Sequence, residues 1–271
     1  MLWSSLGLIT NMFTLDDKPI RNILVSCDHG TMILNRNDSG PDGVGVGRFL
    51  LDHGNNNTVE TDIASKALIN TVDPVVIDIG ANIGTFATFI APWLAKRGGK
   101  LYCFEPQRQV FQILCGNLAI NNIFNVYAYE TAIGREEKWI EIPEVDYDQP
   151  GSFAAFTLGG ADLSDTYKSV AGAMQRIKMT TIDRFVLEHR VPKVDYIKID
   201  AEGLDLDVIN GAAQTIEKFK PDLYVEYLNL GDSQRQDTSD QGRAKLIEVL
   251  KKLGYSYMVV GHDIFATTKQ V

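Results

Sequence analysis

The sequence predicts an α/β protein in which a mostly parallel sheet is covered by helices on both faces. From Val75 onward, short apolar runs alternate with helix-length segments, a pattern typical of repeated βα units. The first of these runs, VVIDI, leads directly into the glycine-containing turn GANIG. With 271 residues, 45% of them hydrophobic, the chain is long enough for one such domain and an N-terminal appendage.

Residues 1–72 are predicted to form an N-terminal, β-rich cap, and residues 73–271 the α/β domain. The runs ILVS and TMIL, broken by the turn-rich NRNDSGPDGVGVG, indicate hairpins in the cap. The segment VETDIASKALIN, residues 59–70, has apolar residues at helical spacing and stops at the following Asp-Pro, so we expect a lead-in helix there.

The elements of the α/β domain follow in order. We expect strands at VVIDI, LYCFE and NVYAYE, with helices from Gly84 to about Arg97 and from about Arg108 to Asn121 between them. Later come a short helix at Ile182–Glu188, the strand VDYIKID, a helix from about Leu204 to Lys218 and the strand DLYVEY. The chain is expected to end in a helix from about Gln241 to Leu253 and an antiparallel hairpin of YSYMVV and IFATT.

Residues 143–176 interrupt this alternation. Glu137–Ile142 and Phe153–Leu158 have the composition of strands, but EVDYDQPG separates them and LGGADLSDT follows the second. An excursion of this kind from an α/β core is usually a lid or a substrate-binding loop. We therefore expect this segment to contact the substrate.

The turn after the first core strand has the form Asp78-x-Gly80-x-Asn82-x-Gly84. Its glycines allow a tight strand-to-helix turn and the close approach of a ligand, although they are also ordinary turn residues. The next strand ends in Glu105, and an acid there can bind both hydroxyls of a ribose. A dinucleotide's pyrophosphate needs a small residue where this chain has Asn82, and no anion such as Asp78 beside it. S-adenosylmethionine carries no phosphate, so the sequence favours it over NAD.

Charged residues on the strand VDYIKID mark a second site. Lys198 and Asp200 face the same side of the strand, and Glu202 lies just beyond its end. Charges on a central strand are costly unless they are paired or used. Two interpretations follow: a structural Lys198–Asp200 pair with Glu202 at a helix N-terminus, or acids at the carboxyl end of the sheet, where open α/β folds bind ligands.

The segments VVIDIGANIGTF, YCFEPQ and above all YIKIDAEGLDLDVINGA followed by PDLYVEY resemble the FkbM family of S-adenosylmethionine-dependent methyltransferases. They span roughly Val75 to Tyr227, with Asp205 where the family often has Glu. The resemblance implies a Rossmann-like class I methyltransferase fold with a seven-stranded sheet, and methylation of a hydroxyl on a natural product, sugar or related small molecule. It also implies that the methionine part of the cofactor lies against Asp78, Gly80, Asn82 and Gly84, and the ribose against Glu105 and Pro106.

Methyl transfer to an aliphatic hydroxyl requires a base, and Asp200 or Glu202 is the expected one. Lys198 is expected to orient Asp200 or to stabilise developing charge on the acceptor oxygen. Glu226, at the end of DLYVEY, can also point into the cleft. A second mechanism uses Mg²⁺ held by Asp200, Glu226 and Asn229. A cofactor-binding protein without turnover is the alternative from a different functional class.

The composition limits the classes of molecule that the protein is expected to bind. The net charge of −9 argues against binding to long nucleic acids, which requires clustered Lys and Arg. The N-terminus has no basic region and is too short to span a bilayer, so we expect neither a signal peptide nor a membrane helix. Three cysteines without a CxxC spacing indicate reduced thiols in a cytoplasmic protein. The expected partner is a small hydroxylated acceptor.

Overall fold

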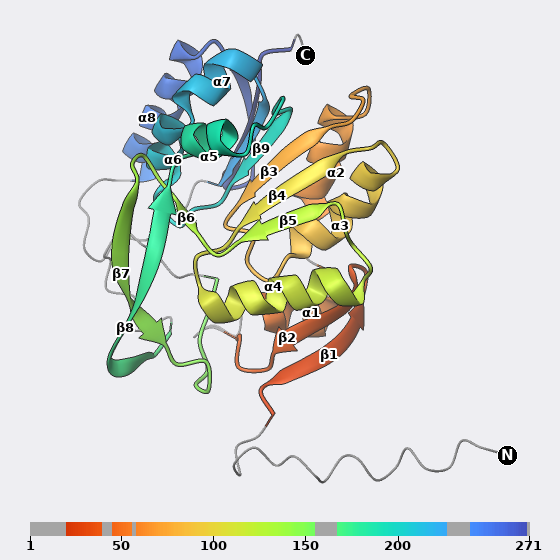
Figure 1. Cartoon of the computed structure of the whole chain (residues 1–271), viewed down its shortest axis with the longest axis vertical. Coiled ribbons are helices and arrows are strands. Elements are labelled where there is room, and N and C mark those ends of the chain that lie inside the picture. Colours follow the sequence, from red (N-terminus) through yellow and green to blue (C-terminus); the bar gives the residue numbers. More distant parts are fainter. Residues whose placement is uncertain (1–19, 40–44, 56–57, 155–166, 227–238, 270–271) are drawn as a thin grey trace, which may run out of the picture.

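A computed structural model of the chain describes residues 20–39, 45–55, 58–154, 167–226 and 239–269. Its main sheet consists of β3 (Val75–Ile79), β4 (Lys100–Phe104), β5 (Val126–Tyr129), β9 (Tyr196–Ile199), β10 (Asp222–Glu226), β11 (Ser256–Val260) and β12 (Asp263–Thr267). The strand order is β11-β12-β10-β9-β3-β4-β5 (Figure 1). Only β12 runs antiparallel to its neighbours, β10 and β11, while the remaining pairs are parallel. The predicted mostly parallel seven-stranded sheet with a terminal antiparallel hairpin is confirmed.

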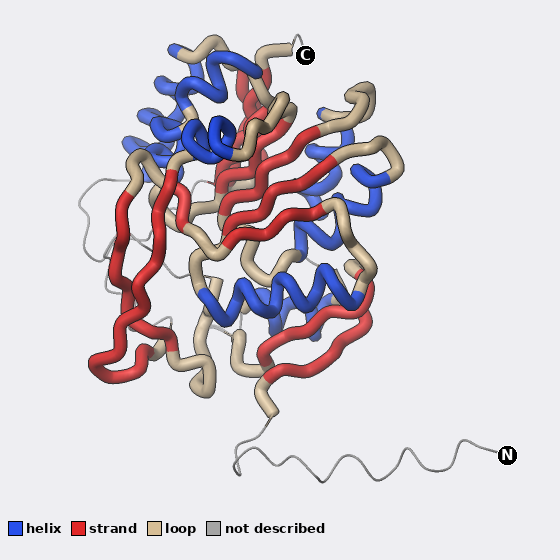
Figure 2. The backbone as a smooth tube through the Cα atoms, in the orientation of Figure 1, coloured by secondary structure: helices blue, strands red, loops and turns tan. Residues whose placement is uncertain are grey.

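Helices cover both faces of this sheet (Figure 2). Side chains of β3 alternate between two hydrophobic clusters, Ile77 in one and Val76 in the other, because successive residues of a strand point to opposite faces. The predicted lead-in helix is confirmed and belongs to the second cluster. One face is covered by α2 (Thr58–Ala67), α3 (Thr85–Ala95) and α4 (Arg108–Ile120), the other by α5 (Ile182–Glu188), α6 (Asp205–Gly211), α7 (Ala213–Phe219) and α8 (Ser239–Lys252).

The prediction of one continuous helix from Leu204 to Lys218 is wrong, because α6 and α7 meet at a break. At the break, Ala212 has φ −110° and ψ 10°, outside the helical region. The carboxylate of Asp183, on α5, accepts hydrogen bonds from the backbone N–H groups of Gln214 (3.0 Å) and Thr215 (2.7 Å). These bonds satisfy donors that a new helix start leaves without partners, so a side chain distant in sequence stabilises the break.

The described part of the N-terminal cap has a hairpin, as expected, and a helix that the sequence did not predict. β1 (Asn22–Cys27) and β2 (Gly30–Asn35) pair antiparallel, and α1 (Val46–His53) follows. The hairpin lies along α4 (Figure 1), where the side-chain amide of Asn117 accepts from the N–H of Ile33 (2.6 Å) and donates to its carbonyl (3.3 Å). The cap is thereby bonded to the sheet domain at a helix next to β4.

The excursion adjoins a second, three-stranded sheet. β8 (Ser169–Thr180) lies between β6 (Ala132–Ile133) and β7 (Lys138–Val145), and β7 and β8 form a long ribbon beside the main sheet (Figure 1). The sequence predicted a strand over most of β7 but none at β8. The first four residues of β8 are all exposed, so this half of the strand lacks the alternating pattern that marks a half-buried strand.

The expected strand at Phe153–Leu158 is wrong where the structure describes it. Phe153 and Ala154 lie in a turn, and the rest of that segment is outside the described residues. The N–H of Phe153 donates to the Asp38 carboxylate instead of to a neighbouring strand (3.1 Å). Phe153 also packs into a cluster shared by the cap, α4 and the excursion, which includes Leu34 and Tyr147. The cap and the excursion are therefore packed against each other.

The state of the cysteines and the length of the helices can also be compared with the sequence predictions. Cys27, Cys103 and Cys115 are all free thiols, and Cys103 is fully buried. Within the part of the chain that the structure describes, no helix has the length and apolar character needed to cross a bilayer.

Candidate active site

A cavity of about 270 Å³ opens where β3, β4, β9 and β10 end. Ligands of open α/β folds bind at this edge, because the carboxyl ends of parallel strands meet there. Most of the residues predicted from the sequence line the cavity: Gly80, Asn82, Glu105, Pro106, Lys198, Asp200 and Glu202, joined by Glu226.

Two predicted cofactor residues, Asp78 and Gly84, are not among the lining residues. Asp78 is completely buried in β3, with its Oδ1 3.5 Å from Nζ of Lys198. Gly84 precedes α3 with φ +90°, and a Cβ there would lie 2.6 Å from the side chain of Leu114. Asp78 therefore interacts with Lys198 and does not line the cavity, and Gly84 packs against α4.

The turn after β3 is built around Gly80. Its φ is +77°, and a Cβ would lie 1.8 Å from the carbonyl oxygen of Asp200. The N–H groups of Gly80 and Ala81 both donate to the carbonyl of Phe104 at 3.0 Å. Only glycine allows this approach, which brings the ends of β3, β4 and β9 together around one cavity.

Glu105 follows β4 and is almost fully buried. Its carboxylate oxygens accept from the N–H groups of Asn82 (3.0 Å) and Gln107 (2.8 Å). Burial raises the pKa of Glu105 to about 8, although both hydrogen bonds act to lower it. Each carboxylate oxygen can accept a further hydrogen bond, so Glu105 remains able to bind hydroxyl groups in the cavity.

Lys198 is a buried cation between two carboxylates. Its Nζ lies 2.9 Å from Oδ2 of Asp200 and 3.5 Å from Oδ1 of Asp78. Burial by itself would lower the pKa of Lys198, but the charges of Asp200, Glu60 and Asp78 raise it well above the usual value. Burial would likewise raise the pKa of Asp200, but the charge of Lys198 and the hydrogen bonds from Glu226 and Lys198 together lower it. At neutral pH both Lys198 and Asp200 are therefore charged.

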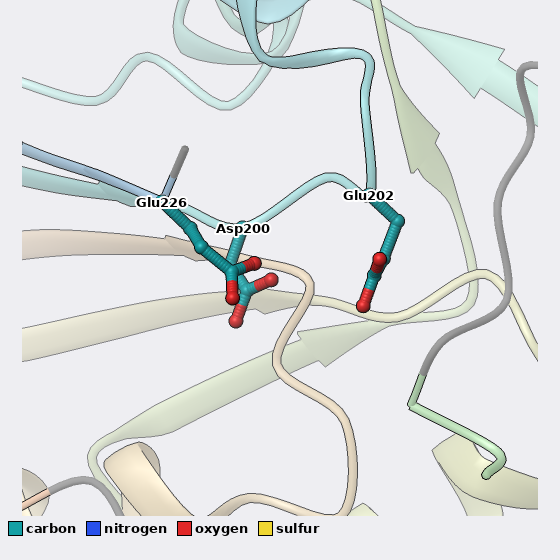
Figure 3. Close-up of side chains that lie close together, drawn as sticks. All are labelled: Asp200, Glu202 and Glu226. Atoms are coloured by element: carbon teal, nitrogen blue, oxygen red, sulfur yellow. The ribbon is translucent and has the colours of Figure 1, made fainter. Parts of the chain in front are cut away.

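Three carboxyl groups converge in the cavity (Figure 3). Oxygens of Asp200, Glu202 and Glu226 all lie within 4.8 Å of one another. Burial, followed by the charges of Asp200 and Asp205, raises the pKa of Glu202 to about 9. Burial and then the charge of Asp200 raise the pKa of Glu226 to about 11. At neutral pH Glu202 and Glu226 therefore hold protons while Asp200 holds the negative charge. Asn229, the third expected metal ligand, lies outside the described residues.

Several cavity-lining residues were not predicted from the sequence, among them Gln107, Val46 and Ala154. Gln107 follows Glu105 by two positions in the segment YCFEPQ, so its proximity to the predicted ribose acid could have identified it. Val46 belongs to α1, and Ala154 ends the described part of the excursion before residue 155. The segment around Val46 carried no pattern that indicated a site, whereas the excursion that contains Ala154 was expected to contact the substrate.

The strand order, the glycine turn after β3 and the acid after β4 define a Rossmann-like class I methyltransferase fold. A family model described as "Methyltransferase FkbM domain" matches residues 78–257, a range that contains both the glycine turn and the KIDAEG segment. The chain belongs to the FkbM methyltransferase family.

Curated relatives carry methyltransferase names. The chain is 28% identical over 152 residues to "Methyltransferase 1" of Beauveria bassiana, covering 51% of this chain and 58% of that protein. It is 24% identical over 184 residues to "Hexuronic acid methyltransferase AglP" of Haloferax volcanii, covering 67% and 66%. It is 25% identical over 167 residues to "2-O-methyltransferase NoeI" of Sinorhizobium fredii, covering 59% and 66%. The chain thus spans somewhat under two thirds of the length of these relatives.

Among solved structures, the FkbM methyltransferase of Methylobacillus flagellatus aligns with a TM-score of 0.48 and 18% identity, covering 73% of this chain and 45% of that one.

Proposed function

We propose that this protein is an S-adenosylmethionine-dependent O-methyltransferase that acts on a hydroxyl of a small molecule, with Asp200 as the base. The observation that carries the proposal is the carboxylate of Asp200, held by Lys198 at 2.9 Å in the same cavity as the glycine turn and Glu105. A sugar-like acceptor is supported by the names of two relatives, a hexuronic acid methyltransferase and a 2-O-methyltransferase.

The charges in the cavity suit this cofactor. Among the described residues that line it, Lys198 is the one cation, and two carboxylates already surround its ammonium group. Four carboxyl groups, those of Glu105, Asp200, Glu202 and Glu226, face the same space. Among these residues no cation is left unpaired for a phosphate, and the charge of Asp200 favours the ammonium and sulfonium groups of S-adenosylmethionine, which would in turn favour ionisation of the neighbouring carboxyl groups. Glu105 would bind the ribose, and the turn at Gly80 would lie along the methionine part.

When bound, S-adenosylmethionine supplies an electrophilic methyl group on a sulfonium. The protein's part is to orient the acceptor hydroxyl and to take its proton. Asp200 accepts that proton, and the ammonium of Lys198 keeps the Asp200 carboxylate ionised and oriented. The protonated carboxyls of Glu202 and Glu226 each offer an O–H donor, which can hold neighbouring oxygens of a polyhydroxylated acceptor.

The first test of this proposal is cofactor affinity in Glu105→Ala. We expect calorimetry to show S-adenosylmethionine bound about 10–100-fold more weakly, since the variant loses two hydrogen bonds to the ribose hydroxyls, each of which contributes about 0.5–1.5 kcal/mol. Glu136→Ala is the matched control, because Glu136 is a surface residue that pairs with Lys138. Wild-type affinity in Glu105→Ala would remove Glu105 from the cofactor site.

Turnover separates an enzyme from a binding protein. We would screen sugars, phenols, polyketides and fatty hydroxy acids as acceptors, and measure the formation of S-adenosylhomocysteine with each. If the protein binds the cofactor but forms no product with any of the four classes of acceptor, a binding protein that has lost turnover would be favoured.

Metal-assisted O-methylation is the second candidate, and the convergence of Asp200, Glu202 and Glu226 within 4.8 Å favours it, because carboxylate oxygens are the preferred ligands of Mg²⁺ and Ca²⁺. If Asp200 acts directly as the base, we expect EDTA to change the rate of product formation by less than about twofold. A rate that falls on EDTA treatment and returns on addition of Mg²⁺ would replace the direct mechanism with the metal-assisted one.

A further inference from the structure

Two of the residues that line the cavity come from the N-terminal cap and from the segment between β7 and β8. Val46 is the first residue of α1, and Ala154 lies in the excursion between β7 and β8. We call this pair the outer wall. The sheet ends supply Gly80 and Glu105, which the proposed function assigns to the cofactor. The outer wall is therefore part of the cavity surface that is left for the acceptor.

Asp38 accepts hydrogen bonds from both of the segments that carry the outer wall. Its side chain is buried, with 4% of the residue exposed. Oδ2 accepts from the N–H of Gly47 at 2.8 Å, and Oδ1 accepts from the N–H of Phe153 at 3.1 Å. Gly47 is adjacent to Val46 in the chain, and Phe153 is adjacent to Ala154. One carboxylate thus links the backbones on which the two wall residues stand.

The start of α1 is shaped to receive Asp38. The residue before the helix, Gly45, has no side chain to cap it, so the bond from Gly47 to Asp38 satisfies a donor that the first turn leaves open. A Cβ on Gly45 would lie 2.5 Å from the carbonyl oxygen of Asp38. That carbonyl also accepts from the N–H of Arg48 at 2.9 Å. The glycines of this segment allow the helix end to approach Asp38 closely.

Gln107 connects the outer wall to the cofactor side. Its Nε2 donates to the carbonyl of Phe153 (2.8 Å), and its Oε1 accepts from the hydroxyl of Tyr147 (2.9 Å). Its backbone N–H donates to Glu105. Both ends of the Gln107 side chain are therefore occupied by the protein, and a hydrogen-bonded path runs from Glu105 through Phe153 to Asp38.

We propose that Asp38 is a positioning residue that fixes the outer wall and thereby determines which acceptors react. This inference rests on the proposed function, since it assigns the remaining surface of the same cavity to the acceptor. Asp38 acts through Val46 and Ala154. Asparagine in its place keeps the size of the side chain but turns one carboxylate oxygen into an N–H₂ group, which cannot accept a hydrogen bond from a backbone N–H.

The experiment compares Asp38→Asn with the matched control Asp183→Asn. Asp183 also accepts hydrogen bonds from two backbone N–H groups at a helix start, those of Gln214 and Thr215, but neither of these is next to a residue that lines the cavity. For both variants we would measure amide hydrogen exchange, S-adenosylhomocysteine affinity by calorimetry, and relative rates with methyl α-D-glucopyranoside, D-glucuronic acid, catechol and 3-hydroxydecanoic acid.

In Asp38→Asn we expect exchange at the amides of Gly47 and Phe153 to accelerate about tenfold or more, as loss of a charge-assisted hydrogen bond lowers the free energy of local opening. The relative rates among the four acceptors should change about tenfold, with S-adenosylhomocysteine affinity unchanged. Asp183→Asn should accelerate exchange only around the start of α7 and keep the wild-type acceptor ratios.

Unchanged exchange at Gly47 and Phe153 in Asp38→Asn would overturn the inference, as would acceptor ratios that match those of Asp183→Asn. Failure of the wild-type protein to bind S-adenosylhomocysteine would count against the proposed function instead. If none of the four acceptors reacts with the wild-type protein, the assignment of the outer wall to acceptors of these classes is overturned.

Discussion

Asp200→Asn is expected to slow single-turnover methyl transfer by about 10²–10⁴-fold at saturating cofactor, the range in which a general base contributes. Asp200 is suited to this role because Lys198 keeps its pKa low, and its carboxylate is therefore ionised at neutral pH. A weak base is sufficient here, since an acceptor hydroxyl becomes strongly acidic as its oxygen gains the methyl group. Rapid quench of one turnover would measure the effect without a contribution from product release.

Glu202→Gln is the matched control for this prediction. With a pKa of about 9, Glu202 is already protonated at neutral pH, so a neutral glutamine of similar shape should reduce the rate by less than about tenfold. The sequence left Asp200 and Glu202 as equal candidates for the base, and the structure supports proposing Asp200. A larger loss in Glu202→Gln than in Asp200→Asn would reverse that assignment, and undiminished rates in both variants would remove the carboxylate mechanism.

Lys198→Met is expected to lower the free energy of unfolding by about 3–5 kcal/mol at neutral pH, the cost of leaving a buried charge without its partner. The methionine side chain has a similar length, but Asp78 and Asp200 would then lose the cation that contacts both of them. Urea denaturation would measure the loss. Lys193→Met is the control, because Lys193 pairs with Asp195 at a partly exposed site and such pairs contribute about 0–1 kcal/mol.

The pH dependence of Lys198→Met gives the sign of the effect. Without the lysine, the pKa values of Asp78 and Asp200 rise, so their neutral forms are favoured in the folded state and the lost stability returns as the pH falls. A second change, Asp78→Asn in the Lys198→Met background, should restore part of the stability at neutral pH. A loss below about 1 kcal/mol with no pH dependence would mean that Lys198 does not hold these two carboxylates.

The centre of the main sheet could be predicted from the sequence because β3, β9 and β10 are buried on both faces. VVIDI, LYCFE and DLYVEY are short apolar runs, and an apolar run with turn residues at its ends indicates a buried strand in almost any context. The exposed half of β8 has no such pattern, since that strand exists through its pairing with β7. The break between α6 and α7 also escaped prediction, because the carboxylate of Asp183 that caps α7 comes from a different helix.

Local sequence determined the family, the glycine turn and the strand-end acids. Gly80, Glu105 and Asp200 follow directly after strands, and parallel strands bring such positions to one edge of the sheet. Only the tertiary structure decided three further points. Asp78 is buried beneath the cavity and contacts Lys198. The negative charge among the three clustered carboxyls resides on Asp200, because only this one contacts the lysine. Gly47 and Phe153, the chain neighbours of the cavity residues Val46 and Ala154, both donate to Asp38. Each depends on contacts between residues far apart in the sequence, and no local pattern encodes which distant partner a side chain will meet.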